Sequence, residues 1–128
     1  MLRQVATEVQ PVVKDLSVVY LYVRDLERSA AFYRDVLGIG LEASKGWAEA
    51  TFPGGTRFGL HAWHEGAPEP GTTGSVHVDF GVDDIDAAAA RLRDAGVDVR
   101  EIRRESYGSH CTFVDPDGYE LELFQPAR

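Results

Sequence analysis

VRDLERSAAFYRDVLGI, residues 23–39, contains the end of one apolar run and the start of a helical pattern. Asp25 stands just before apolar residues that recur at helical spacing, and Gly38 follows the last of them. Aspartate and glycine are residues that commonly cap the start and the end of a helix, so we predict a helix between these two positions. The run that leads into it, SVVYLYV at 17–23, is β-branched and aromatic and predicts a buried strand.

The same strand and helix return in the second half of the chain. EGAPEPGTTG (65–74) is rich in Pro, Gly and Thr and predicts a linker, and the alternating run SVHVDFGV (75–82) after it predicts a strand. Asp84 then precedes the Ala-rich helical segment IDAAAARLRDAG (85–96). A shift of 59 positions (84 − 25) places Asp25 on Asp84 and aligns further residues of the two helices, which indicates an internal duplication.

Further strands are predicted after each helix. They are WAEATF (47–52) and TRFGLHAW (56–63) in the first half, and VDVREI (97–102), SHCTFV (109–114) and YELELFQ (119–125) in the second, with the turn DPDG (115–118) before the last. Each half is too small to bury a sheet face alone, so we expect a single domain with helices on one face and an open concave face. The predicted parts are an N-terminal arm at 1–16 and a two-module domain at 17–125, composed of module one at 17–63, a linker at 64–74 and module two at 75–125.

The charge balance of the chain restricts its partners. Lys and Arg number 13 and Asp and Glu number 21, which gives a formal net charge of −8. Nucleic acids and anionic membranes are bound by clustered basic residues, so we expect neither as a partner. The single cysteine excludes an internal disulfide and fits a reducing compartment. No apolar run approaches the ~20 residues of a membrane span, and the first residues lack a signal-peptide pattern, so we expect a cytoplasmic protein.

Two motifs carry a family resemblance. VRDLERSAAFYRDVLGI (23–39) followed by FVDPDGYELELF (113–124) resembles the vicinal oxygen chelate superfamily, over roughly residues 17–125. That superfamily includes glyoxalase I, fosfomycin-resistance thiol transferases, extradiol dioxygenases, methylmalonyl-CoA epimerase and the bleomycin-binding resistance proteins. The resemblance implies an α+β fold of two tandem βαβββ modules, whose paired curved sheets surround a concave cavity. It also implies a homodimer with the cavity at or near the subunit contact.

The resemblance further implies where a divalent metal is bound. Metal-dependent members take a His from the first strand of each module and a Glu from the last strand of module two. His77, seven residues before Asp84, and Glu122, seven residues after Asp115, match the second and third of these ligands. Val18 stands where the first ligand is expected, and valine has no donor atom. Only half of the family's metal site is therefore present at the expected positions.

Two interpretations of these residues remain open. In one, a shifted site uses His77 and Glu122 with His61 or His110 to bind one Zn, Fe, Mn or Ni ion, and Glu122 acts as both ligand and catalytic base. The chain is then a metal-dependent lyase, isomerase, thiol transferase or dioxygenase. In the other, which we favour, His77 and Glu122 are a hydrogen-bonded pair in a cavity that needs no cofactor, and the chain binds a small molecule as bleomycin resistance proteins do.

Strand alternation predicts which side chains face the ligand. Aromatic and charged groups dominate this set, which is typical of a small-molecule site and suits an aromatic or cationic compound. The predicted ligand-binding residues are Tyr20, Tyr22, Arg57, Trp63, Asp79, His110 and Phe124. For Trp63, at the end of its strand, contact with a second subunit is an equal alternative. Trp47 and Glu49 share one face of their strand, but alternation alone does not say which face.

Overall fold

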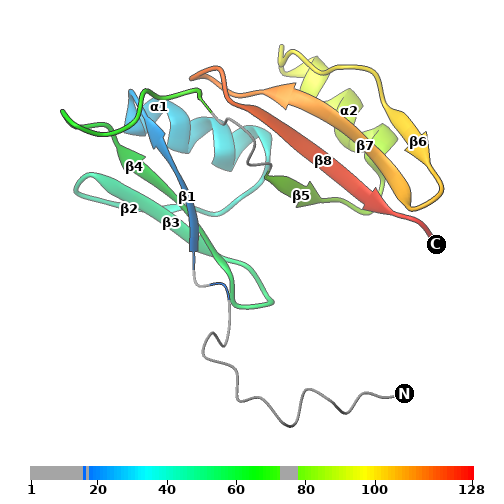
Figure 1. The fold of residues 1–128 in the computed structure, drawn as a ribbon, viewed down its shortest axis with the longest axis horizontal. Helices are drawn as coiled ribbons and strands as arrows, with labels where there is room; N and C mark the ends of the chain where they lie inside the picture. Colours follow the sequence, from blue (N-terminus) through cyan, green and yellow to red (C-terminus); the bar gives the residue numbers. More distant parts are fainter. Residues whose placement is uncertain (1–15, 17, 73–77) are drawn as a thin grey trace, which may run out of the picture.

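The structure is a computed structural model in which residues 16, 18–72 and 78–128 are described. It contains two four-stranded sheets, one from each half of the chain (Figure 1). The first sheet has the order β1-β4-β3-β2 and consists of β1 (Val18–Val23), β2 (Glu42–Ser44), β3 (Trp47–Thr51) and β4 (Arg57–Ala62). The second has the order β5-β8-β7-β6 and consists of β5 (Asp79–Gly81), β6 (Arg103–Glu105), β7 (Gly108–Val114) and β8 (Glu120–Pro126). This equivalent arrangement confirms the predicted α+β fold.

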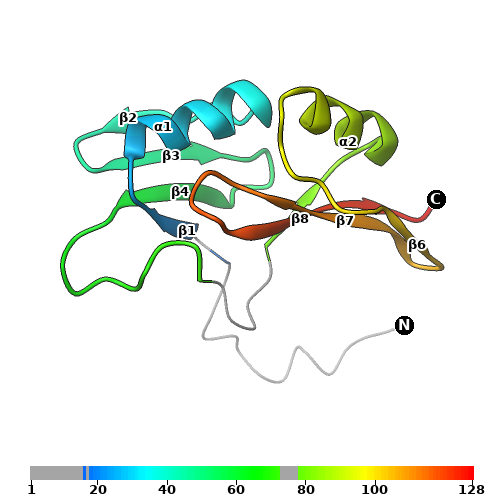
Figure 2. The ribbon, with the colours of Figure 1, turned by 90° about the horizontal axis from the view of Figure 1, so that it is seen from above.

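Each sheet has its own helix, and both helices lie on the same side of the molecule (Figure 2). α1 (Leu26–Ala31) contacts β3 and β4, and α2 (Ile85–Asp94) contacts β7 and β8. Asp25 and Asp84 cap these helices as predicted, because their carboxylates accept hydrogen bonds from the third backbone N–H after them. α1 continues into a π-helical turn, η2 (Phe32–Val36), before the chain turns at Gly38 with φ 75°.

A shared aromatic core joins the two modules. Phe58 on β4 and Phe80 on β5 have ring centroids 5.3 Å apart, and Tyr33 from η2 lies 5.1 Å from Phe58. Phe113 on β7 adds a fourth ring, 6.3 Å from Phe80. Because Tyr33, Phe58 and Phe113 are almost fully buried, neither sheet buries its apolar face without the other module. The opposite faces of both sheets carry the half-exposed side chains of the predicted site.

Two elements differ from the sequence predictions. The strand predicted at 97–102 is wrong: Val99 forms only an isolated bridge with Phe113, and the regular strand β6 begins at Arg103. Val99 and Ile102 are three positions apart, so in a regular strand these two apolar side chains would point to opposite faces. The short strand β2 was not predicted, and the strand predicted at 75–82 is described only from residue 78 onward. No helix in the described ranges is long and apolar enough to cross a membrane.

Candidate functional site

The first sheet presents a cluster of rings on the face turned away from α1. We call Tyr20, Tyr22, Trp47 and His61 the aromatic face. Strand alternation places Tyr20 and Tyr22 opposite the buried Leu21 on β1, and the parallel register sets Tyr22 beside His61 of β4. The antiparallel register of β3 and β4 sets Trp47 on the other side of His61. Three neighbouring strands thus bring the four rings together.

The rings of the aromatic face contact one another directly. The centroids of Tyr22 and His61 lie 5.0 Å apart, and those of Tyr20 and Trp47 lie 5.5 Å apart. Trp47 and His61 are 5.9 Å apart, within the range of roughly 4.5–7 Å for interacting aromatic pairs. His64 extends the cluster, 5.6 Å from His61. Tyr20 is 45% exposed, so an apolar surface rich in rings remains open to a ligand.

Charged groups border the aromatic face. Glu49 accepts a hydrogen bond from Trp47 Nε1 at 2.8 Å and from Arg57 Nη1 at 3.2 Å. Glu42 lies opposite Glu49 in the β2–β3 pair, on the same face of the sheet. This border therefore carries two carboxylates and one guanidinium, and its net negative charge favours a cationic ligand.

The Tyr22 hydroxyl and the His61 imidazole of the aromatic face each have a polar partner. Hydrogen bonding with the Tyr20 hydroxyl raises the pKa of Tyr22 above its ordinary value. His61 Nδ1 lies 2.8 Å from the carbonyl oxygen of Ala62, and a carbonyl can only accept, so Nδ1 carries a proton. The aromatic face thus offers rings and polar atoms, and the carboxylates and the guanidinium lie at its border.

Trp63 lies apart from the aromatic face. Its indole Nε1 donates to the carbonyl of Ala67 at 3.3 Å, within the loop that follows β4. None of the described rings is in aromatic contact with Trp63. Because Trp63 is 43% exposed, ligand binding and contact with a second subunit both stay predictions for it. Trp47 and Glu49 are site residues that the sequence did not select.

The second sheet carries a different open face, which we define by Tyr107, His110, Glu122 and Phe124. His110 Nδ1 lies 3.4 Å from Glu122 Oε1, because β7 and β8 are antiparallel neighbours. The Tyr107 ring is nearly parallel to that of His110, with 14° between their planes and 6.2 Å between their centroids. Beside this face lies a polar cavity of about 360 Å³, lined in part by His110, Glu122, Arg100 and Arg103.

Asp79 and Cys111 have distinct surroundings in the second module. Asp79 pairs in register with Glu122, and it borders two apolar cavities of about 350 and 460 Å³ between the modules, both lined by Phe52 and Phe80.

Cys111 is buried, and burial raises the pKa of its thiol above the ordinary value. The thiol is therefore protonated near neutral pH and packs as a small core side chain, not as a nucleophile.

The predicted metal ligands do not all come together in the described residues. A divalent ion needs imidazole and carboxylate donors that converge on one point. His61 lies on β4 of the first sheet, whereas Glu122 lies with His110 in the second. In the part of the chain that the structure describes, no three His, Cys, Asp or Glu side chains form a group that could hold a metal. His77 lies outside the described residues and stays a predicted ligand.

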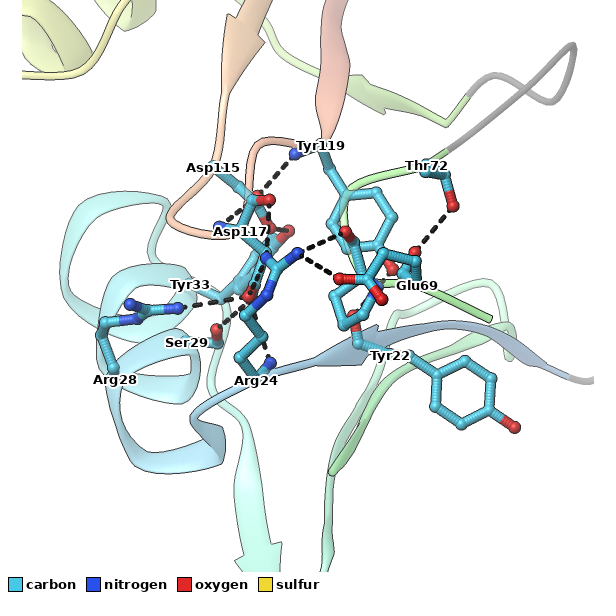
Figure 3. A network of polar contacts seen from close by, with 11 residues as sticks. Tyr22, Arg24, Arg28, Ser29, Tyr33, Glu69, Thr72, Asp115, Asp117 and Tyr119 are labelled. Carbon is cyan, nitrogen blue, oxygen red and sulfur yellow. Dashed lines mark hydrogen bonds and ion pairs between the residues drawn. The ribbon is translucent and has the colours of Figure 1, made fainter. Parts of the chain in front are cut away.

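The turn before β8 forms a buried polar network that joins the two modules (Figure 3). The Asp117 carboxylate has no exposed area and accepts hydrogen bonds from Arg24 Nη1 at 3.1 Å and from Ser29 Oγ at 3.1 Å. Arg28 Nη2 adds a contact at 3.2 Å. Glu69 pairs with the outer side of Arg24 at 3.0 Å. The start of α1 is thereby fixed to the second module.

Asp115 forms the other half of this network. Its Oδ1 accepts from the backbone N–H groups of Asp117 and Tyr119, both at 2.9 Å, and its Oδ2 accepts from the Tyr33 hydroxyl at 2.7 Å. The Tyr119 hydroxyl donates to the carbonyl of Tyr22 at 2.7 Å, which ties β1 to the same turn. As Figure 3 shows, the Tyr22 ring points away from the network. The network therefore positions the strand that carries Tyr22 without using its side chain.

We predict that Asp115→Asn changes how stability depends on pH. Burial raises the pKa of Asp115 above its ordinary value, although the hydrogen bonds from Tyr33, Tyr119 and Asp117 act to lower it. The folded state then binds this proton more tightly than the unfolded chain, so the contribution of Asp115 to stability is lost as pH rises through the raised pKa. Asparagine keeps the shape and has no proton to lose.

The expected result is a change in relative stability with pH. The free energy of unfolding of Asp115→Asn, measured in urea, should improve relative to wild type between about pH 3.5 and pH 7. A difference that is independent of pH, or that moves in favour of wild type, would contradict this assignment.

The sequence of this chain is similar to a known family and to several known proteins. The profile of the Glyoxalase/Bleomycin resistance protein/Dioxygenase superfamily matches residues 15–123. The chain is 33% identical over 124 residues to the uncharacterized protein YaeR of Escherichia coli, covering 88% of this chain and 96% of the relative. It is 32% identical over 119 residues to a probable lactoylglutathione lyase of Synechocystis, covering 80% and 88% of the two chains.

A solved structure shows the same fold. TnmS3, an antibiotic binding protein from Streptomyces sp. CB03234, superposes with a TM-score of 0.77 at 29% identity, covering 92% of this chain and all of TnmS3. The agreement covers both modules together, because nearly the whole chain is matched. This chain belongs to the Glyoxalase/Bleomycin resistance protein/Dioxygenase superfamily.

Proposed function

We propose that this protein binds a small, aromatic and cationic molecule on the aromatic face, and that binding needs no metal ion. The observation that carries the proposal is the contact of four rings from three strands on an open sheet face. Such rings attract apolar and cationic groups, and the carboxylates of Glu42 and Glu49 lie at the border. Val18 on this sheet stands where the resemblance places the family's first metal ligand, and its side chain supplies no donor atom.

We also propose that the protein acts as a cytoplasmic homodimer. The aromatic face and the face with His110 and Glu122 belong to different sheets, and each is half open in one chain. A second copy that covers these faces would enclose the ligand, in agreement with the subunit contact that the family resemblance implies. The division into two modules at 17–63 and 75–125, with residues 64–74 as a linker, is part of this proposal.

A second candidate function is metal-dependent catalysis on the face of the second sheet. It is favoured by the His110–Glu122 contact beside a polar cavity of about 360 Å³. Relatives named as a probable lactoylglutathione lyase and as the glutathione transferase FosA of Serratia marcescens are consistent with it. FosA is 29% identical over 115 residues, covering 86% of this chain and 79% of FosA. In this alternative, His77 and Glu122 are the ligands, and Glu122 is also the base.

The binding proposal can be tested with matched probes. 9-Aminoacridine is a planar cation, and anthracene-9-carboxylate is a planar anion of similar size. We expect calorimetric titration of the chelated protein to show saturable binding of the cation, at least about tenfold tighter than the anion, because the border carboxylates favour positive charge. Equal affinity for both probes would contradict the charge assignment, and no binding of either would contradict the aromatic face as a ligand site.

A further inference from the structure

Trp47 packs on the backbone of Gly59. A Cβ atom added to Gly59 would lie 2.3 Å from Cη2 and 2.4 Å from Cζ2 of the Trp47 indole. No pair of real side chains tolerates such distances, so the six-membered ring of the indole occupies the space of a side chain at position 59. Gly81 on β5 offers a contrast, because a Cβ atom there would meet nothing within 4 Å.

The indole is also held at its edge. Trp47 Nε1 donates a hydrogen bond to Glu49, and Arg57 donates another to the same carboxylate, so the edge of the ring is held in one orientation. Tyr20 and His61 stand at 70° and 77° to the indole plane, with centroids 5.5 and 5.9 Å away. Among the described rings, therefore, none is stacked parallel on Trp47, which is only half buried.

Resting on the proposed function, we infer that Trp47 is the residue that makes this site specific for planar ligands. Because Gly59 has no side chain, the indole packs on its backbone and forms an apolar floor there. The rings of Tyr20 and His61 stand steeply beside this floor with centroids 6.1 Å apart, too close to admit a third ring between them, so a planar cationic heteroaromatic ring stacks on the indole next to them. The carboxylates of Glu42 and Glu49 lie at the edge of the floor, where the positive charge of the ligand is stabilised.

The packing of the Trp47 indole on Gly59 is tested by fluorescence. All variants carry Trp63→Phe, so that Trp47 is the sole tryptophan. Gly59→Ala is expected to lift the indole and to raise its quenching by acrylamide at least about twofold, because the new methyl group takes the space of the ring. The matched control, Gly81→Ala, adds the same methyl group to a strand of the other sheet with no such contact. Equal quenching in both variants would contradict the packing of the Trp47 indole on Gly59.

The specificity for planar ligands is tested by two cationic probes of different shape. 9-Aminoacridine is flat, whereas adamantan-1-amine is a compact cage. Trp47→Leu keeps an apolar side chain but removes the flat floor, so we expect the affinity for 9-aminoacridine to fall at least about tenfold, as for the loss of one aromatic stack. The affinity for adamantan-1-amine should change less than about threefold.

The outcomes separate this inference from the proposed function. If wild type binds 9-aminoacridine and Trp47→Leu binds it equally well, the role of Trp47 is wrong while the binding proposal stands. If wild type binds neither cation, the binding proposal fails. The quenching experiment still decides whether the Trp47 indole packs on Gly59. A circular dichroism spectrum of each variant shows that it is folded.

Discussion

Asp117→Ala is expected to lower the free energy of unfolding by about 1.5–3 kcal/mol, because it removes the hydrogen bonds to a buried charged acceptor. The Asp117 carboxylate is fully buried and contacts Arg24, Arg28 and Ser29. Alanine leaves these donors without their acceptor at the junction of the modules. Because this junction also positions β1, we expect the loss to appear as one cooperative transition at lower urea concentration.

Glu69→Ala is the matched control, because Glu69 pairs with the same Arg24 side chain. Glu69 is 68% exposed in its side chain, and exposed ion pairs contribute no more than about 1 kcal/mol. Both variants remove one carboxylate from Arg24, so the comparison tests what a buried carboxylate, which also pairs with Arg28, contributes beyond an exposed one. An Asp117→Ala variant as stable as Glu69→Ala would show that the network does not hold the modules together.

Removing two rings from the aromatic face is expected to abolish most ligand binding. In the double variant Tyr20→Ala/Tyr22→Ala, we expect the affinity for 9-aminoacridine to fall about 100-fold, because each ring that contacts the ligand beside the Trp47 indole contributes roughly tenfold. Both side chains lie on the open face of β1, away from the core residue Leu21. The fold should therefore survive the change.

The control is Tyr20→Phe/Tyr22→Phe, which keeps the rings and removes only the hydroxyl groups. Its affinity should stay within about threefold of wild type, since stacking depends on the ring faces. Loss of binding in the phenylalanine variant would mean that the hydroxyl groups, and not the rings, recognise the ligand. Both variants are measured by calorimetry on chelated protein.

Strand alternation predicted the aromatic face only in part. The period of two residues placed Tyr20, Tyr22 and His61 on one side of their strands, and the structure brings them together. The same rule put Trp47 and Glu49 on a common face without saying which one. The register of β3 against β4, which pairs Trp47 with His61, decides this, and such a register depends on contacts between distant residues.

The polar network illustrates a second limit of the sequence. DPDG at 115–118 predicted a turn, and the hydrogen bond from Gly118 N–H to the Asp115 carbonyl at 3.0 Å forms it. Nothing local shows that Asp117 meets Arg24, 93 positions away in the chain. The duplication predicted two similar modules, but the way that they pack depends on these non-local contacts. Local patterns thus predict elements and faces, whereas contacts between modules need the folded structure.

The central claim is that ligand binding needs no metal, and one titration tests it most directly. Tag-free protein is titrated calorimetrically with 9-aminoacridine after chelation, and again with Mn, Fe, Ni or Zn added. We predict the same affinity in every case, because the rings and the border carboxylates make all the contacts. Binding that appears only with one equivalent of metal, and that is lost in His77→Ala and Glu122→Ala, would contradict the account and assign the protein to the metal-dependent enzymes of its superfamily.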